Sequence, residues 1–168
     1  ARAGKGVCRL KTGGPFVFGR GGEEALFLAA AGIPFEVVPG VTAAVAVPGA
    51  AGIPVSHRGL AAVCTVVTGH GDPDGGGVDW EAVARAGGTV VVLMGLKHLA
   101  RIAERLRRGG LAGGTPAAVI TRGTLPEERV VTGTLADIAA RAEAAGAAPP
   151  GILVVGDVVS LRGGKTPG

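Results

Sequence analysis

Charged side chains and glycines are concentrated in residues 9–24, which read Arg-Leu-Lys-Thr-Gly-Gly-Pro-Phe-Val-Phe-Gly-Arg-Gly-Gly-Glu-Glu. The segment carries three cations, two carboxylates and five glycines. Glycine lets the backbone approach a ligand closely or adopt a positive φ. The segment also lies between an apolar run and a helical pattern, where ligands bind in parallel α/β sheets. The sequence is neither GxGxxG nor a Walker loop, so spacing alone leaves a turn with solvated charges as an equal alternative.

Three further segments combine small residues with polar or polarizable groups. Residues 39–44, Pro-Gly-Val-Thr-Ala-Ala, follow an apolar run and open a helix that the Thr42 hydroxyl can cap. Met94 ends another apolar run before a glycine, where its thioether could contact a flat ligand. Residues 121–124, Thr-Arg-Gly-Thr, end a third run. For each segment the simpler alternative is an ordinary turn, cap or core residue.

The pattern of apolar residues predicts which elements position these segments. Strand-like runs, most of them continuous and rich in β-branched residues, predict strands at 6–10, 35–38, 62–68, 89–93, 117–121, 130–134 and 152–155. Helical patterns occupy 23–31, 42–51, 80–86, 96–108 and 135–145. Strands that alternate with helices predict an α/β fold with mainly parallel sheets.

Composition excludes several classes of protein. Cys8 and Cys64 lie far apart without clustered histidines, so we expect reduced thiols, a cytoplasmic protein and no metal site. Residues 37–55 carry no charge, but prolines and glycines interrupt them, so no membrane association is expected. The net charge is +4, yet the chain has only five aromatic residues. We therefore expect no nucleic-acid binding, and we interpret the basic helical pattern at 96–108 as a solvated face.

The segment at 9–24 resembles the Arg-Leu-Lys-Gly-Gly-Asp-Pro-Phe-Val-Phe-Gly-Arg-Gly-Gly-Glu-Glu signature of uroporphyrinogen-III C-methyltransferases, members of the tetrapyrrole methylase family. The similarity continues to about Arg162. It implies two α/β domains with the cofactor cleft between them, the first domain being incomplete here. The implied domains are residues 1–56, the C-terminal half of the N-terminal domain, and residues 57–168, the C-terminal domain.

The resemblance also implies an activity and partners. The activity is S-adenosylmethionine-dependent methylation of uroporphyrinogen III to precorrin-2, on the route to sirohaem and cobalamin. Family members are usually homodimers, so a homodimer is expected. A cationic cleft would suit this polyanionic substrate.

Site residues carry over from the resemblance segment by segment. Arg20 and Glu23 are implied to act in catalysis and to face the substrate, together with Arg58 and Met94. We favour a positioning role for Arg20, with Glu23 orienting it, because a guanidinium is a poor proton acceptor. His57 is expected to be structural. The implied cofactor-binding residues are Thr12, Gly13, Gly14, Val17, Thr42, Ala43, Met94 and Gly123.

The chain departs from the family pattern in two places. The family's opening strand and its Gly-x-Gly-Pro-Gly-Asp loop are absent, and the chain begins with Ala1, so we expect a fragment with little activity by itself. Gly14 stands where the family has Asp, and Thr12 where it has Gly. These departures keep two alternatives open: a non-catalytic ligand-binding relic or partner module, and a methylase of a later corrin precursor.

Overall fold

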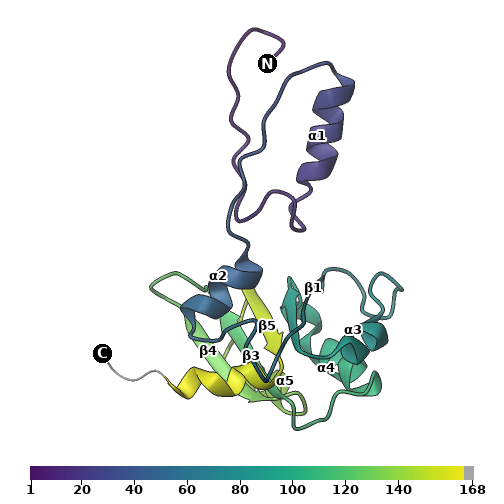
Figure 1. The fold of residues 1–168 in the computed structure, drawn as a ribbon, viewed down its shortest axis with the longest axis vertical. Coiled ribbons are helices and arrows are strands. Elements are labelled where there is room, and N and C mark those ends of the chain that lie inside the picture. The colour runs from purple at the N-terminus through teal and green to yellow at the C-terminus, as the bar shows by residue number, and fades with distance from the viewer. Residues whose placement is uncertain (165–168) are drawn as a thin grey trace. The chain divides into compact units, whose positions relative to one another are not determined.

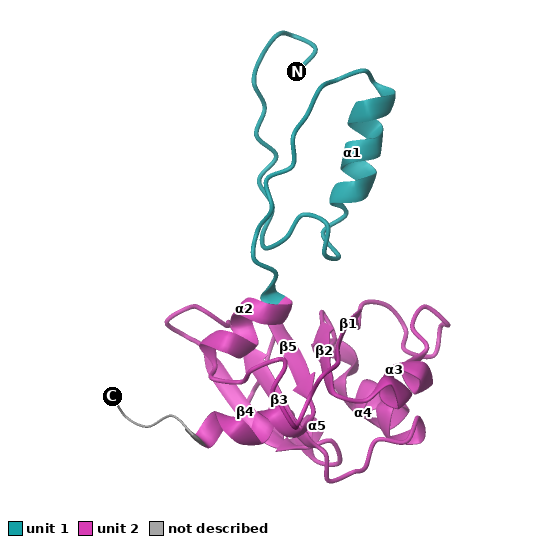
Figure 2. Cartoon of the chain, viewed as in Figure 1, with its two compact units in different colours: residues 1–43 teal, residues 44–168 magenta. Residues whose placement is uncertain are grey.

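The chain divides into two compact units, Ala1–Ala43 and Ala44–Gly168 (Figure 2). The structure is a computed structural model that describes residues 1–164. The boundary between the units lies at 43/44 and not at the predicted 56/57. The reason is burial: Ala44 and Ile53 are fully buried in a core cluster of the second unit. The assignment of family domains at 1–56 and 57–168 stays a prediction.

The second unit is built on a five-stranded sheet in the order β1-β2-β5-β3-β4 (Figure 1). Strands β1 and β2 are parallel, whereas β5 runs antiparallel to both β2 and β3. The strands are β1 (Cys64–Thr68), β2 (Thr89–Leu93), β3 (Pro116–Thr121), β4 (Arg129–Thr134) and β5 (Gly151–Val155). The α/β class is confirmed, but the prediction of mainly parallel pairing is wrong and the sheet is mixed.

The chain path after β3 explains the antiparallel pairing. Strand β4 runs back along β3, with Thr134 opposite Pro116. The segment that contains α5 (Ile138–Ala144) then returns the chain to the other end of β3, where Gly151 lies opposite Thr121. Strand β5 must therefore run back beside β3, because it starts where β3 ends.

Helices cover both faces of this sheet. One core cluster joins one face of β2, β3 and β5 to α3 (Trp80–Ala86), α4 (Leu99–Arg108) and α5. The other cluster joins the opposite face to α2 (Ala43–Ala50) and η2 (Asp157–Gly164). Neighbouring residues along β2 alternate between the clusters, with Val92 in the first and Val91 in the second. Both faces of the central strands are buried, which explains why these strands are continuous apolar runs in the sequence.

The first unit contains one regular element, α1 (Gly21–Ala30) (Figure 1). The predicted strands at 6–10 and 35–38 are wrong for the described structure, since neither segment forms a ladder. Val7 is 72% exposed and Val38 is 73% exposed. An extended apolar segment becomes a strand only where another strand pairs with its backbone groups, and residues 1–43 supply no such partner.

Two kinds of feature are absent from residues 1–164. None of the helices described here has the length and apolar character needed to cross a membrane. In the same part of the chain, no three His, Cys, Asp or Glu side chains gather in a way that could hold a metal ion.

Candidate functional site

In the first unit, two of the motifs predicted to bind the cofactor lie against each other. The backbone of Gly13 passes so close to Gly40 that a Cβ on Gly40 would come within 2.3 Å of the Gly13 carbonyl oxygen. In the opposite direction, a Cβ on Gly13 would lie 3.4 Å from the Val41 carbonyl oxygen. The crossing of residues 13–14 with residues 40–42 therefore depends on glycine, and it brings Gly13 and Gly14 beside Thr42 and Ala43.

The chain after this crossing forms a tight turn that ends at α1. The N–H of Val17 donates to the carbonyl oxygen of Gly14 at 3.1 Å, and the N–H of Gly21 donates to that of Pro15 at 3.0 Å. A Cβ on Gly21 would lie 2.5 Å from the same Pro15 oxygen, so only glycine fits there. This packing fixes the position of Val17, which sequence reasoning placed at the cofactor.

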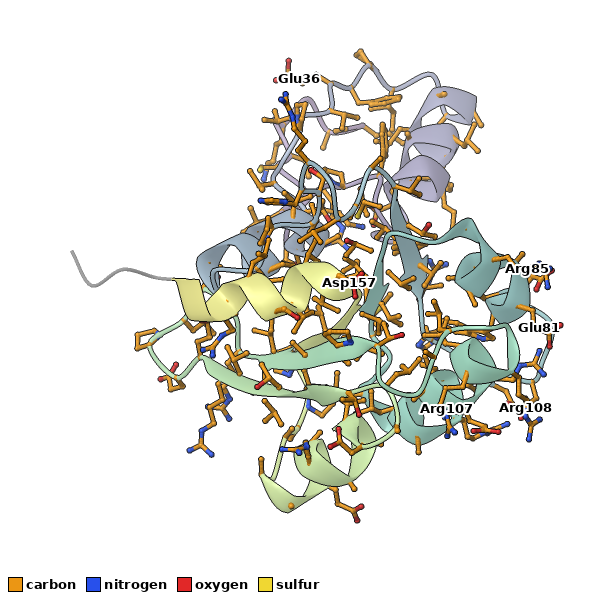
Figure 3. The ribbon with its side chains drawn as sticks, turned by 60° about the horizontal axis from the view of Figure 1, so that its bottom comes forward. Glu36, Glu81, Arg85, Arg107, Arg108 and Asp157 are labelled. Carbon is orange, nitrogen blue, oxygen red and sulfur yellow. The ribbon has the colours of Figure 1, made fainter. Side chains whose placement is uncertain are left out.

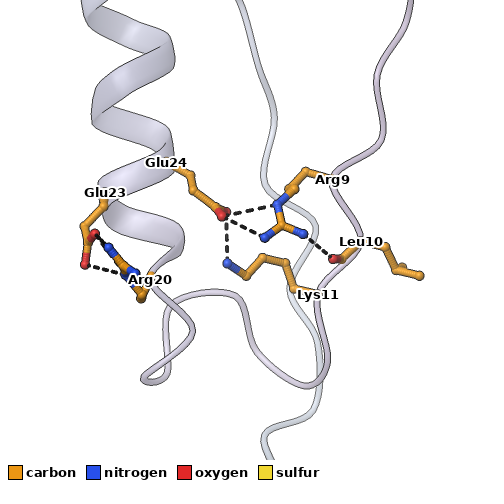
Figure 4. Close-up of polar contacts among 6 residues, drawn as sticks. All are labelled: Arg9, Leu10, Lys11, Arg20, Glu23 and Glu24. Carbon is orange, nitrogen blue, oxygen red and sulfur yellow. Dashed lines mark hydrogen bonds and ion pairs between the residues drawn. The ribbon is translucent and has the colours of Figure 1, made fainter.

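Arg20 and Glu23 form the pair that the sequence predicted (Figure 4). The guanidinium of Arg20 donates to both carboxylate oxygens of Glu23, the shortest contact being 2.6 Å. This bond, together with the positive charge, holds the pKa of Glu23 below its ordinary value and raises that of Arg20. The pair is exposed, and it keeps Glu23 ionised and the guanidinium oriented.

A second polar cluster next to this pair was not predicted. The Glu24 carboxylate accepts from Lys11 Nζ at 2.9 Å and from Arg9 Nε at 3.2 Å (Figure 4). The hydrogen bond from Lys11 is the main reason that the pKa of Glu24 lies below its ordinary value. Glu24 thus ties the start of α1 to the extended segment at 9–11, a contact between residues too far apart in sequence for local spacing to reveal.

In the second unit, the segment predicted around Gly123 packs against α2. A Cβ on Gly123 would meet Val47 Cγ1 at 2.3 Å, so the loop after β3 touches the helix directly. Helix α2 begins at Ala43, immediately after Thr42. A side chain at position 123 would therefore collide with Val47 of α2.

Met94 and the loop around Gly123 follow the carboxyl ends of β2 and β3, which lie at the same end of the sheet; this end is called the edge below. Leu93 and Ile120 both pair with Ile152, from opposite sides of β5. Since neighbouring strands are about 4.8 Å apart, the residues that follow β2 and β3 are separated by roughly 10 Å. Met94 is 49% exposed at this edge. A ligand of moderate size could contact both loops.

The loops after β1 and β2 are also locked together. The N–H of Gly69 donates to the Leu93 carbonyl oxygen at 2.7 Å, and a Cβ on Gly69 would lie 2.5 Å from the Cα of Gly95. This contact holds the backbone on both sides of Met94. Neither glycine was predicted to matter, although the Met-Gly pair was noted in the sequence.

Backbone strain is concentrated in the predicted motifs. The non-glycine residues with positive φ in the described chain are Phe18, Arg20, Met94, Arg122 and Thr124. Each lies in the glycine-rich segment, at the end of β2 or after β3. Such conformations cost roughly 1–3 kcal/mol each and gather at functional sites. The positive φ of Arg122 and Thr124 was not predicted, because neither residue type favours a left-handed backbone.

Arg58 stays without a described ion pair in a tight loop. The N–H groups of His57 and Ala61 each donate to the other residue's carbonyl oxygen, at 3.0 and 2.9 Å. The Nδ1–H of His57 donates to the Arg58 carbonyl oxygen at 2.8 Å. These hydrogen bonds support the structural role expected for His57, which stays a prediction, and Arg58 is exposed.

The basic face of α4 is matched by carboxylates. Arg107 and Arg108 both pair with Glu104, at 3.4 and 3.0 Å, and Arg101 pairs with Asp72 and Asp74. Figure 3 shows Arg107 and Arg108 on the outer side of α4, near Glu81 and Arg85 of α3. The paired charges support the interpretation of this helix as a solvated face.

Comparisons with known proteins agree with these motifs. The model of the tetrapyrrole (corrin/porphyrin) methylases matches residues 1–139. An S-adenosyl-L-methionine-dependent uroporphyrinogen III methyltransferase of Methanosarcina barkeri is 56% identical over 164 residues, which make up 96% of this chain and 64% of that protein. A siroheme synthase of Gluconacetobacter diazotrophicus is 51% identical over 96% of this chain and 35% of its own length. The chain thus spans less than two thirds of each of these relatives.

Solved structures give the same result. A uroporphyrin-III C-methyltransferase from Thermus thermophilus, complexed with S-adenosyl homocysteine, superposes with a TM-score of 0.80 and 42% identity. The match covers 95% of this chain and 69% of that one. A cobalt precorrin-4 methyltransferase shares the fold, with a TM-score of 0.86 at 24% identity over 94% of this chain and 66% of that one. The chain belongs to the tetrapyrrole (corrin/porphyrin) methylase family.

Proposed function

We propose that the complete gene product containing this chain is a uroporphyrinogen-III C-methyltransferase, which converts uroporphyrinogen III to precorrin-2 for sirohaem and cobalamin synthesis. The observation that carries the proposal is the 56% identity to an S-adenosyl-L-methionine-dependent uroporphyrinogen III methyltransferase over 96% of the chain. The strained residues add support, because they fall in the motifs that the resemblance assigns to the site.

The cofactor of the proposed reaction is S-adenosylmethionine, and the residues present fit it. Gly13 and Gly14 carry no side chain where they cross residues 40–42, and glycine lets the backbone approach a ligand closely. We assign Thr12, Gly13, Gly14, Val17, Thr42 and Ala43 of the first unit, and Met94 and Gly123 of the second, to cofactor binding. When bound, the cofactor would supply a methyl group on a positively charged sulfur, and the neutral thioether that remains after transfer is a good leaving group.

The protein's own contribution is alignment and exclusion of water. The loops after β2 and β3 are fixed by packing at Gly95 and Gly123, so Met94 can present its thioether without reorganisation. Arg20, oriented by Glu23, and the exposed Arg58 would bind carboxylates of the substrate. The net charge of +4 favours the approach of a polyanion.

The test is an assay of the complete gene product with uroporphyrinogen III and S-adenosylmethionine, in which precorrin-2 is identified by mass and absorbance. We expect methylated product from the wild type and a loss of about tenfold or more in kcat/KM for Arg20→Ala. Arg85→Ala, on the exposed side of α3, serves as the control and should leave activity unchanged. Binding of S-adenosyl homocysteine without any methylated product would contradict the proposal.

One observation favours a second candidate, a non-catalytic ligand-binding module of the same fold. Gly14 lacks the carboxylate that the family signature places there. The same assay separates the two functions, because a module would bind ligand and form no product. Homodimer formation, a cytoplasmic location and the absence of nucleic-acid and membrane partners remain predictions.

A further inference from the structure

Arg122 is the one arginine in the second unit that the described structure holds in a left-handed conformation, with φ of 50°. Only glycine adopts this region without steric cost, because the Cβ of an L-residue crowds the following carbonyl. The neighbouring Gly123 does not adopt a positive φ, so the strained position is occupied by arginine and not by the adjacent glycine. Arginine thus occupies a position whose backbone conformation glycine would adopt at lower steric cost.

Contacts on both sides enforce this backbone conformation. The N–H of Arg122 donates to the Pro150 carbonyl oxygen at 2.9 Å, and its own carbonyl oxygen accepts from the N–H of Leu125 at 3.1 Å. Gly123 is pressed against Val47 of α2. With both backbone groups bonded and the next residue packed, the point at which the side chain leaves the backbone is fixed.

The guanidinium itself has no described partner. Within residues 1–164, no carboxylate lies within ion-pair distance of Arg122, whereas Arg101 and Arg105 on α4 are paired. The same loop contains Glu127 and Glu128, and the Glu128 carboxylate accepts from the backbone N–H of Thr124 at 2.9 Å. The Glu128 carboxylate is thus engaged with the backbone.

The position of Arg122 places it at the edge that carries Met94. Thr121 lies opposite Gly151 at the start of β5, and Leu93 pairs with the next residue of that strand, Ile152, on the other side. Two strand spacings, or about 10 Å, separate the backbones of the two loops. Other charged residues of the loops at this edge are Lys97, three residues after Met94, Arg129 at the start of β4, and the Glu127 and Glu128 carboxylates just before it.

We propose that Arg122 is a further anion-binding residue of this site and that its guanidinium holds a carboxylate of the bound ligand. The inference rests on the proposed function, whose substrate is a polycarboxylate. An arginine guanidinium can form two parallel hydrogen bonds to one carboxylate, which gives orientation as well as affinity. The carboxylate can come from the tetrapyrrole or from the amino-acid end of the cofactor, and we expect the tetrapyrrole because it carries more of them.

The test compares Arg122→Gln, Arg122→Lys and Arg122→Gly with wild type in the complete gene product. Binding of uroporphyrin III is measured by fluorescence, binding of S-adenosyl homocysteine by calorimetry, and both KM values by assay. We expect Arg122→Gln to weaken uroporphyrin III roughly tenfold and to raise the substrate KM similarly, with kcat little changed. Arg122→Lys should recover part of this loss. Arg85→Gln on α3 is the matched control.

The outcomes separate the sources and the possible failures. A loss confined to S-adenosyl homocysteine would support the anion-binding role with the cofactor as its source. Unchanged affinity for both ligands in an active enzyme would overturn the inference and leave the proposed function intact. A wild type that binds uroporphyrin III through Arg122 and forms no product would support the inference and contradict the proposed catalysis.

Stability supplies an independent measurement. Arg122→Gly removes the guanidinium and relieves the left-handed strain, so its Tm should equal or exceed that of wild type. Weaker uroporphyrin III binding at an unchanged or higher Tm is the expected combination. A clearly lower Tm for Arg122→Gly would show that the side chain serves folding, and it would overturn the proposal.

Discussion

Similar apolar sequences have different fates in the two units of this chain. Strand β2 is buried along its whole length, and Val91 and Val92 are fully inaccessible. The strand predicted at 6–10 in the first unit also carries apolar side chains, although Arg9 interrupts them, and there Val7 is 72% exposed and Leu10 is 83% exposed. The difference shows that an apolar run specifies a strand only together with a neighbouring strand and a covering layer.

The helices show the same contrast. Leu106 of α4 is fully buried, whereas Leu26 and Phe27 of α1 are 74% and 72% exposed. Helix α1 is tied to the first unit mainly through the charges of Glu24 with Arg9 and Lys11. The second unit is therefore stabilised by its core, and the first by polar contacts and close backbone packing.

The largest effect should come from deleting a core side chain. Leu106→Ala removes a fully buried leucine, so we expect the free energy of unfolding to fall by about 2–5 kcal/mol. Leu26→Ala in α1 should change it by less than about 0.5 kcal/mol. Urea unfolding followed by circular dichroism checks both. Equal effects at the two positions would show that α1 is as well packed as α4.

Restoring the missing carboxylate should act on binding and leave folding alone. A Cβ on Gly14 would lie 3.3 Å from the Gly40 carbonyl oxygen and 3.4 Å from Val17 Cγ2, so Asp fits with a small movement. In the complete gene product, Gly14→Asp should tighten S-adenosyl homocysteine by roughly ten- to a hundredfold, or about 1.5–3 kcal/mol. Gly22→Asp adds the same charge where nothing lies within 4 Å and is the control. Calorimetric titration showing equal affinities would remove Gly14 from the cofactor site.

Adding one methyl group should distinguish the tight contacts of the second unit from the open surface of α1. Gly123→Ala puts a Cβ into Val47, so we expect destabilisation by about 1–3 kcal/mol. Gly22→Ala in α1 meets nothing and should stabilise the helix by about 0.5–1 kcal/mol. Thermal melts of the two variants should shift in opposite directions. A common direction would mean that the loop after β3 adapts freely.

The smallest effect concerns two carboxylates whose pKa values are lowered for different reasons. Asp137 next to α5 accepts the N–H of Thr134 at 2.7 Å, and this bond is the main cause of its low pKa. Glu24 owes its low pKa chiefly to Lys11. Because both folded pKa values lie below the unfolded ones, each contribution to stability is present above the ordinary pKa and is lost as the pH falls through the folded value.

Salt separates these two carboxylates. Carboxyl titrations by NMR should show the pKa of Glu24 moving toward its ordinary value in high salt, since exposed charge pairs are screened. The pKa of Asp137 should move less, because a backbone hydrogen bond holds it. If the two pKa values respond equally to salt, the low pKa of Glu24 does not depend more on charge pairing than that of Asp137.

Local sequence was sufficient for the class of the fold and for most of its elements. Trp80–Ala86 and Thr89–Leu93 lie where the periodicity and the β-branched run predict them, and the other strands of the second unit begin or end within two residues of expectation. The glycine-rich segment and the Met-Gly and Arg-Gly-Thr turns were also visible, because glycine and the ends of apolar runs are local features. The pairing of Arg20 with Glu23 followed from their spacing in one turn.

The tertiary structure alone decided the rest. The order β1-β2-β5-β3-β4, the antiparallel direction of β5 and the unit boundary at 43/44 depend on which distant segments bury each other. The same is true of the crossing between Gly13 and Gly40 and of the strained backbone of Arg122, which is hydrogen-bonded to Pro150. Periodicity and propensity describe a residue among its neighbours in sequence, whereas pairing, burial and strain arise from contacts between residues that only the fold brings together.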